Sequence, residues 1–165
     1  MKIPSLQEAQ QLLAAAEQLN LGRWVTHSRH VAEAARAIAG ADPDLDPEVS
    51  YILGLLHDVG RREGRTSIRH IIDGYNFLHP LGHEDSAKIC LTHSFALQNT
   101  DAIFGEWDCT DEERSFVDSY IQNLEYTDYD RLLQLCDTLA LFDGFVLMEK
   151  RMLDAALRYG TAAHS

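Results

Sequence analysis

The sequence predicts an all-α fold, a single domain of roughly six to eight helices. Its 165 residues match the length of one ordinary domain, and 45% of them are hydrophobic, so the chain can bury a core. Apolar residues recur at three- and four-residue steps through nearly every segment, and no segment shows the two-residue alternation of a half-buried strand. We therefore expect one helical domain spanning residues 1–165.

Capping and stop residues divide the first 60 residues into three helices. We expect these helices over residues 5–20, 23–40 and 47–60. Ser5 opens the first helix with Ser-Leu-Gln-Glu, a capping box, and Asp46 followed by Pro47 is typical of the start of the third. The third helix contains YILGLLHDVG and is apolar almost all round, so we expect it to be the central, buried helix.

Five further helices are expected along the rest of the chain. They cover residues 67–78, 84–93, 110–124, 128–142 and 145–159, and Gly160 follows the last. Thr66 or Ser67 can cap the first of these, and Thr110 opens a second capping box. Asp130, in the run EYTDYD that precedes the helix bearing Asp137, is expected to serve in capping and packing, and a place in the lining of the pocket is the alternative. The segment 94–109 is irregular, and we expect that it could close over a site as a lid.

Composition excludes several classes of function. The net charge of −12 repels a phosphate backbone, so we expect no nucleic-acid partner, although a small anionic substrate remains compatible. No apolar run approaches the roughly 20 residues of a membrane span and no secretion signal precedes the first helix, which predicts a cytoplasmic protein without membrane contacts. Cys90, Cys109 and Cys136 predict neither a disulfide framework nor a thiolate zinc site, and we expect Cys90 and Cys136 to be buried.

Four ionisable side chains interrupt the apolar patterns. His27 lies on the apolar stripe of its helix, His57 and Asp58 end the most hydrophobic run, and Asp137 interrupts LLQLCDTLALF. Burying such groups unpaired is costly, and convergence on one divalent cation would satisfy all of them. Imidazole and carboxylate ligands suit manganese, iron, cobalt, nickel or zinc, with magnesium a further option. Because any one such residue is ordinarily a hydrogen-bonded core group or a cap, a structural polar network is the alternative.

The segments WVTHSRHVA, YILGLLHDVGR and LCD resemble the H…HD…D signature of the HD superfamily of metal-dependent phosphohydrolases. The resemblance extends over most of the chain, with its core motifs within residues 23–142, and it implies an HD-type helical bundle. It also implies which residues bind the metal ion: His27, His57, Asp58 and Asp137. His30 competes with His27 for the first of these positions, but its place one turn on favours the flank of the helix.

The resemblance extends to a second metal ion. HIIDGYNFL from His70 looks like the H-x-x-x-G-x-x-x-L segment of two-metal members, and THS looks like their next histidine motif, with Ser94 in place of a second histidine. This implies a second ion held by His70 and His93, with Asp58 bridging the two ions. The alternative is that both histidines serve in hydrogen bonding around the first ion or in substrate contact.

The resemblance implies an enzyme that hydrolyses a small phosphorylated molecule, most simply a nucleotide. Asp58 would orient the attacking water, Arg61 and Arg62 would hold phosphate oxygens, and Lys150 and Arg151 would reach the anion from the last helix. A solvated loop and surface ion pairs are the alternatives for these four basic residues. Two other functions remain open, a metal-containing nucleotide sensor without turnover and a di-iron oxygenase. Oligomeric state is left undetermined.

Overall fold

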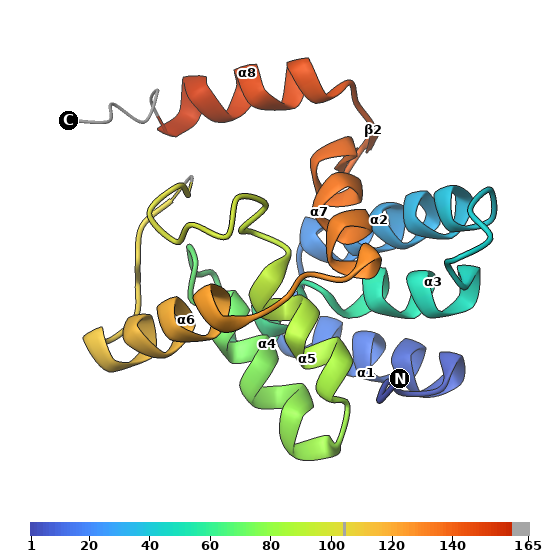
Figure 1. Ribbon diagram of the computed structural model, residues 1–165, viewed down its shortest axis with the longest axis horizontal. Helices are drawn as coiled ribbons and strands as arrows, with labels where there is room; N and C mark the ends of the chain where they lie inside the picture. Colours follow the sequence, from blue (N-terminus) through green and yellow to red (C-terminus); the bar gives the residue numbers. More distant parts are fainter. Residues whose placement is uncertain (104, 160–165) are drawn as a thin grey trace.

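The computed structural model describes residues 1–103 and 105–159, without the side chains of residues 155, 158 and 159. The described part is all-α, as the sequence predicted, apart from one minimal β-hairpin (Figure 1). Its α-helices are α1 (Leu6–Leu19), α2 (Arg23–Ala39), α3 (Pro47–Leu56), α4 (His70–Leu78), α5 (Glu84–Thr92), α6 (Asp111–Asn123), α7 (Asp128–Leu139) and α8 (Met148–Tyr159). The 3₁₀ helices are η1 (Val59–Glu63) and η2 (His79–Leu81), and the strands are β1 (Ala140–Leu141) and β2 (Gly144–Phe145).

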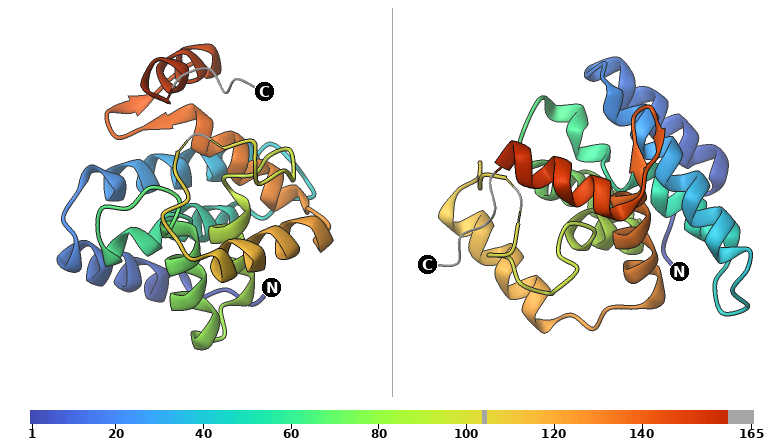
Figure 2. Two further views of the ribbon diagram at one scale, coloured as in Figure 1. Left: turned by 90° about the vertical axis from the view of Figure 1, so that its left-hand side faces the viewer. Right: turned by 90° about the horizontal axis from the view of Figure 1, so that it is seen from above.

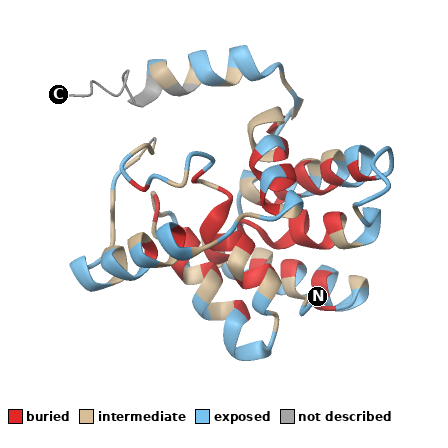
Figure 3. Ribbon diagram, in the orientation of Figure 1, coloured by how far each residue is buried: buried red, intermediate tan, exposed pale blue. Residues whose placement is uncertain are grey.

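Helices α2 and α3 form the central pair of the bundle. Helix α1 packs against α3 and η1, α7 lies across α2 and α3, and α4 pairs with α5 (Figure 2). Buried residues gather where these helices face one another, whereas α8 and the outer faces are exposed (Figure 3). In the part of the chain that is described, no helix combines the length and apolarity that crossing a bilayer would require.

Helix α3 is the buried central helix that its composition predicts. Leu53, Leu55 and Leu56 are buried, and a Cβ atom built on Gly54 would lie 2.5 Å from the Cα of Ala32. Glycine at this position therefore lets α2 and α3 approach closely. The predicted end at residue 60 was wrong, because the α-helix stops at Leu56 and the chain continues as η1.

The starts of the helices follow the predicted caps in part. Thr110 forms a complete capping box with Glu113, and Ser5 accepts from the backbone N–H of Glu8. The carboxylate of Glu8 instead contacts His83, so the first box is half formed. Helix α4 begins at His70 without a side-chain cap, later than the sequence predicted.

A carboxylate distant in sequence replaces the predicted cap of α4. Asp108 accepts hydrogen bonds from the backbone N–H groups of Ser67 and Arg69, at 2.6 and 2.7 Å. These are donors that a Thr66 or Ser67 hydroxyl would otherwise have satisfied. The prediction of a local cap was wrong, because the carboxylate of Asp108, distant in sequence, accepts these hydrogen bonds instead.

The chain after α7 contains a hairpin that the sequence did not predict. Ala140 pairs with Phe145 and Leu141 with Gly144, around a turn at Phe142 and Asp143. The φ of Gly144, the first residue after the turn, is 134°, a conformation that favours glycine. Because Phe145 is held in this pair, α8 begins at Met148 and not at residue 145. The predicted stop at Gly160 lies outside the described residues. Cys90 and Cys136 are buried and all three cysteines are unpaired, as expected.

Candidate metal centre

The ends of several helices bring six histidine and aspartate side chains to one point in the core. His27 comes from the second turn of α2 and Asp137 from the last turn of α7. His57 is the C-cap of α3, and Asp58 follows it directly before η1. His70 begins α4, and His93 is the C-cap of α5. These are the six residues that the sequence selected as ligands. His30 lies outside the cluster, since its Nδ1 is 2.8 Å from the carbonyl oxygen of Leu141.

Backbone carbonyls set the orientation of three of the imidazoles. The Nδ1 of His57 lies 2.8 Å from the carbonyl oxygen of Gly54. The Nδ1 of His70 lies 2.6 Å from the carbonyl oxygen of Ser67, and the Nδ1 of His93 lies 3.1 Å from that of Ile89. A carbonyl oxygen only accepts, so each Nδ1 carries the proton. In the neutral ring Nε2 then presents its lone pair, which is the arrangement of a histidine that binds a metal.

The Nε2 atoms and carboxylate oxygens form two groups that share Asp58. One group is His27, His57 and Asp58, the other is Asp58, His70 and His93, and within each group the donor atoms lie within 4.8 Å of one another. Asp137 adjoins the first group, with Oδ1 2.9 Å from His27 Nε2 and 3.7 Å from His57 Nε2. Asp58 Oδ1 lies 3.1 Å from His70 Nε2 and 3.8 Å from His93 Nε2.

The donor set fits a divalent cation. His57 Nε2 and Asp58 Oδ1 are buried, and neither has a hydrogen-bond partner among the described residues. Leaving such atoms unsatisfied is costly, and native proteins rarely do so without a reason. Two ligand atoms, each about 2.1 Å from the same ion, are roughly 3–4 Å apart, which is the separation seen around Asp58 and Asp137.

The two carboxylates remain ionised in spite of their burial. Burial acts to raise the pKa of Asp58, but the charge of Arg61, followed by His70 and His57, holds that pKa well below its usual value. Burial also acts to raise the pKa of Asp137, and the hydrogen bond with His27 and the contact with His57 hold it well below normal. A charged carboxylate is the form that binds a cation.

The histidines differ in their response to the same surroundings. Burial, together with the neighbouring His57, lowers the pKa of His93 to about 3, so His93 is a neutral imidazole. Burial also acts to lower the pKa of His57, but Asp58 and Asp137 outweigh it and raise that pKa. The negative field that favours a proton on His57 equally favours a metal ion beside it.

Comparison with protein families agrees with this geometry. The family model of the HD domain matches residues 24–141. The chain belongs to the HD domain family. The match confirms the resemblance seen in the H…HD…D segments, and HD domains are generally metal-dependent hydrolases that bind divalent metals. Comparison of the chain with curated proteins gave no match, and neither did comparison with solved structures.

The basic residues predicted to bind substrate occupy different places in this HD domain. Arg61 lies at the centre, with Nε 2.6 Å from Asp58 Oδ2. Arg62 turns away, packs over the ring of Phe77 at 4.0 Å and pairs with the adjacent glutamate. Lys150 and Arg151 lie on α8, and neither side chain makes a hydrogen bond or ion pair with another described residue. The structure thus brings Arg61 alone of the four to the cluster.

A buried hydrogen-bond network surrounds Asp130, in addition to the capping role that the sequence predicted for it. Its carboxylate is fully buried and accepts from Thr92 Oγ1 at 2.8 Å, while Lys88 Nζ lies 2.6 Å away. Gln134 donates to the Thr92 carbonyl oxygen at 3.0 Å. These bonds tie α5 to α7, the helices that present His93 and Asp137. The signal in the sequence was weak, because a capping aspartate reveals nothing of a partner 38 residues away.

The segment predicted as a lid is irregular in its described part, as expected. It is fastened at several points: Gln98 donates to the carbonyl oxygens of Ile121 and Leu124, Thr100 donates to Asp118, and Asp108 caps the approach to α4. Closure over the centre remains a prediction.

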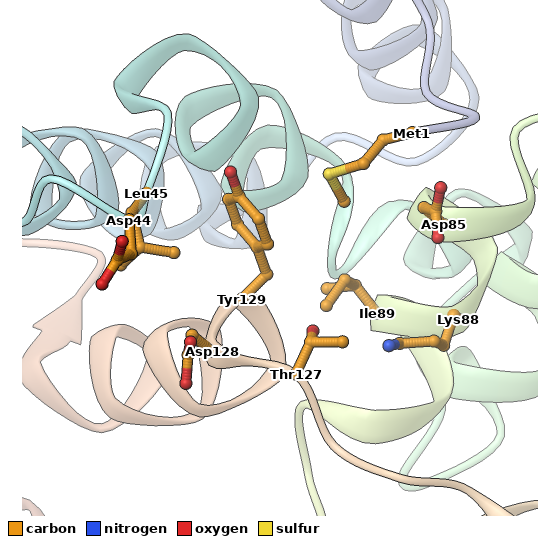
Figure 4. Close-up of a pocket in the computed structure, with 9 residues that line it drawn as sticks. All are labelled: Met1, Asp44, Leu45, Asp85, Lys88, Ile89, Thr127, Asp128 and Tyr129. Carbon is orange, nitrogen blue, oxygen red and sulfur yellow. The ribbon is translucent and has the colours of Figure 1, made fainter.

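A cavity of about 270 Å³ opens elsewhere on the HD domain. Figure 4 shows its lining, which comes from the N-terminus, the turn before α3 and the starts of α5 and α7. Lys88 and Thr127 border it, and both also contact Asp130. None of the six clustered side chains lines this cavity, so the cavity and the candidate metal centre are separate sites.

Proposed function

We propose that this HD domain is a metal-dependent phosphohydrolase that hydrolyses a small phosphorylated molecule, most simply a nucleotide. The observation that carries the proposal is the surroundings of Asp58, a buried ionised carboxylate with an unpartnered oxygen and three imidazole nitrogens turned towards it. Membership of the HD family supports the reaction class. The net charge of −12 favours a small anion over a nucleic acid as the substrate.

The donor chemistry suits a transition metal. His27, His57, Asp58 and Asp137 would hold a first ion, and His70 and His93 would hold a second with Asp58 between them. Mixed imidazole and carboxylate ligands are typical of manganese, iron, cobalt, nickel and zinc. When bound, such an ion makes water a competent nucleophile near neutral pH and polarises a phosphoryl oxygen.

The protein's own groups would position the reactants. The unpartnered Oδ1 of Asp58 can accept a hydrogen bond from a water molecule and orient it. Arg61 carries a charge that cannot be titrated away and lies 29% exposed beside the centre, where that positive charge can attract a phosphate group. Phosphoryl transfer depends mainly on such positioning and charge neutralisation.

The deciding experiment is elemental analysis of protein purified without added metal or chelator. We expect one to two equivalents of a transition metal in the unmodified chain and loss of that metal in His57→Ala. His30→Ala is the matched control, because His30 lies one turn from His27 but outside the cluster, and it should retain the metal. Metal-free protein that also fails to bind added manganese, iron, cobalt, nickel, zinc or magnesium would refute the proposal.

Turnover is then measured on nucleotides and simple phosphate esters with the metal found. Phosphate release that disappears in His57→Ala and persists in His30→Ala would support hydrolysis by this centre. Tight metal binding without release of phosphate from any of them would instead favour a sensor, and an iron-dependent visible spectrum would favour redox chemistry.

A further inference from the structure

The guanidinium of Arg61 lies within the second donor group. Its Nε is 2.6 Å from Asp58 Oδ2, and its Nη2 is 3.5 Å from His70 Nε2. Asp58 and His70 are two of the three residues in the group completed by His93. Because His70 Nδ1 faces the Ser67 carbonyl oxygen, Nε2 is the acceptor nitrogen of the neutral ring. Arg61 therefore approaches the same lone pair that a metal ion would use.

The backbone of η1 holds Arg61 in this position. Its N–H donates to the Asp58 carbonyl oxygen at 3.0 Å, and its own carbonyl oxygen accepts from the Asn20 side chain at 2.6 Å. Nη1 lies 3.5 Å from the carbonyl oxygen of Thr66. Contacts with the end of α1, with Asp58 and with the loop after η1 therefore hold the residue on three sides. Its side chain is more restricted than that of a fully exposed arginine.

The two donor groups differ in the charge next to them. In the first group, His27 Nε2 and His57 Nε2 lie beside the carboxylate of Asp137. Asp58 is common to both groups, so its pairing with Arg61 Nε at 2.6 Å does not separate them. The second group differs in His70, whose Nε2 lies 3.5 Å from Arg61 Nη2 and so faces a guanidinium that keeps its charge at any pH that the folded protein tolerates. Like charges repel strongly where water is excluded, so the second group is the poorer cation site for as long as Arg61 stays in place.

We infer that Arg61 sets the metal stoichiometry of this centre, acting as a built-in cation that keeps the second donor group from binding a metal ion. This inference rests on the proposed function, since the first group must hold an ion for the second to be distinguished from it. The centre then binds one metal ion tightly at the first group, and His70 and His93 do not bind a second ion while Arg61 is in place. Arg61 is in this sense a residue that determines metal number, separate from any contact with substrate.

The test is titration of the metal-free protein with Mn²⁺, followed by calorimetry and by electron paramagnetic resonance. The unmodified chain should bind one ion tightly and a second only weakly. Arg61→Gln should bind the second ion at least about tenfold more tightly, with the first little changed, because the repelling charge is gone. At two equivalents its spectrum should show the exchange coupling of a manganese pair.

Two further variants make the test specific. Arg61→Lys keeps the positive charge and should still bind one tight ion, which also shows whether position 61 tolerates substitution. Arg65→Gln removes the same charge from an exposed position in the same segment and should behave as the unmodified chain does. Circular dichroism melting confirms that each variant is folded.

Two results would overturn the inference while leaving the proposed function intact. One is two tight ions in the unmodified chain, and the other is a second ion that binds Arg61→Gln no better than the unmodified chain. Failure of every variant to bind even a first ion would contradict the proposed function, and the inference about Arg61 with it.

Discussion

Gly60, two residues after Asp58, decides how closely η1 can lie against α4. A Cβ atom at this position would be 2.0 Å from the carbonyl oxygen of His70 and 2.3 Å from the backbone nitrogen of Gly74. Both neighbours are backbone atoms, which cannot turn aside as a side chain can. The missing side chain thus lets His70 come within 3.1 Å of Asp58.

Substituting Gly60→Ala should therefore force η1 and α4 apart. We expect a loss of about 3 kcal/mol in the free energy of unfolding, measured by urea denaturation in the presence of a chelator. Metal affinity should fall too, because Asp58 and His70 separate. Gly40→Ala is the control: its backbone is helical and the nearest atom to a new Cβ is 3.3 Å away, so its effect should be much smaller. Equal stability of the two variants would contradict this account of Gly60.

Among the elements, the irregular segment before α6 is joined to α4 through Asp108. Its two carboxylate oxygens accept from the backbone N–H groups of Ser67 and Arg69, and the carbonyl oxygen of Glu106 accepts from Ile68. Burial acts to raise the pKa of Asp108, but these backbone donors outweigh it and lower that pKa. The ionised form is thus favoured more in the folded chain than in the unfolded one.

The substitution Asp108→Asn should destabilise the protein in a pH-dependent way. An amide offers one acceptor oxygen for two N–H donors, so we expect a loss of about 1–2 kcal/mol at pH 7. A lowered folded pKa gives stability that is complete above the unfolded value of about 3.9 and is lost as the pH falls through the folded pKa. The difference between variant and unmodified chain should then shrink below about pH 4. Urea denaturation at a series of pH values measures it, and a difference that grows towards acid pH would contradict the assignment.

For the whole molecule, the candidate metal centre is a junction of five helical segments. Its six clustered side chains come from α2, the α3–η1 junction, α4, α5 and α7, which together contain most of the buried core. An ion bound there would stabilise the packing of these segments against one another, because the unfolded chain does not hold the six side chains together. Metal binding and global unfolding should therefore be coupled.

The melting temperature should accordingly rise with metal concentration and fall when a chelator is added. A free metal concentration 1,000 times the Kd corresponds to about 4 kcal/mol of added stability. Differential scanning calorimetry measures the shift, and His57→Ala should show little or none of it. A melting temperature independent of metal in the unmodified chain would mean that the six side chains form a structural polar network.

Local pattern determined the helices and pointed to the clustered side chains. Apolar spacing predicted the helical bundle, and the interruption of apolar stripes by His27, His57, Asp58 and Asp137 singled out residues that the fold brings together. Such inferences succeed because helix periodicity and the cost of burying a charge act over a few residues, which a sequence displays directly.

Only the tertiary structure decided which distant groups meet. Asp108 caps α4 in place of a local hydroxyl, Asp130 joins Thr92, and Arg61 turns to Asp58 while Arg62 packs over a ring. The two adjacent arginines are alike in the sequence, and the 3₁₀ geometry of η1 separates their directions. The physical reason is that hydrogen bonds and ion pairs depend on positions in space, and segments about 40 residues apart acquire these only when the chain has packed.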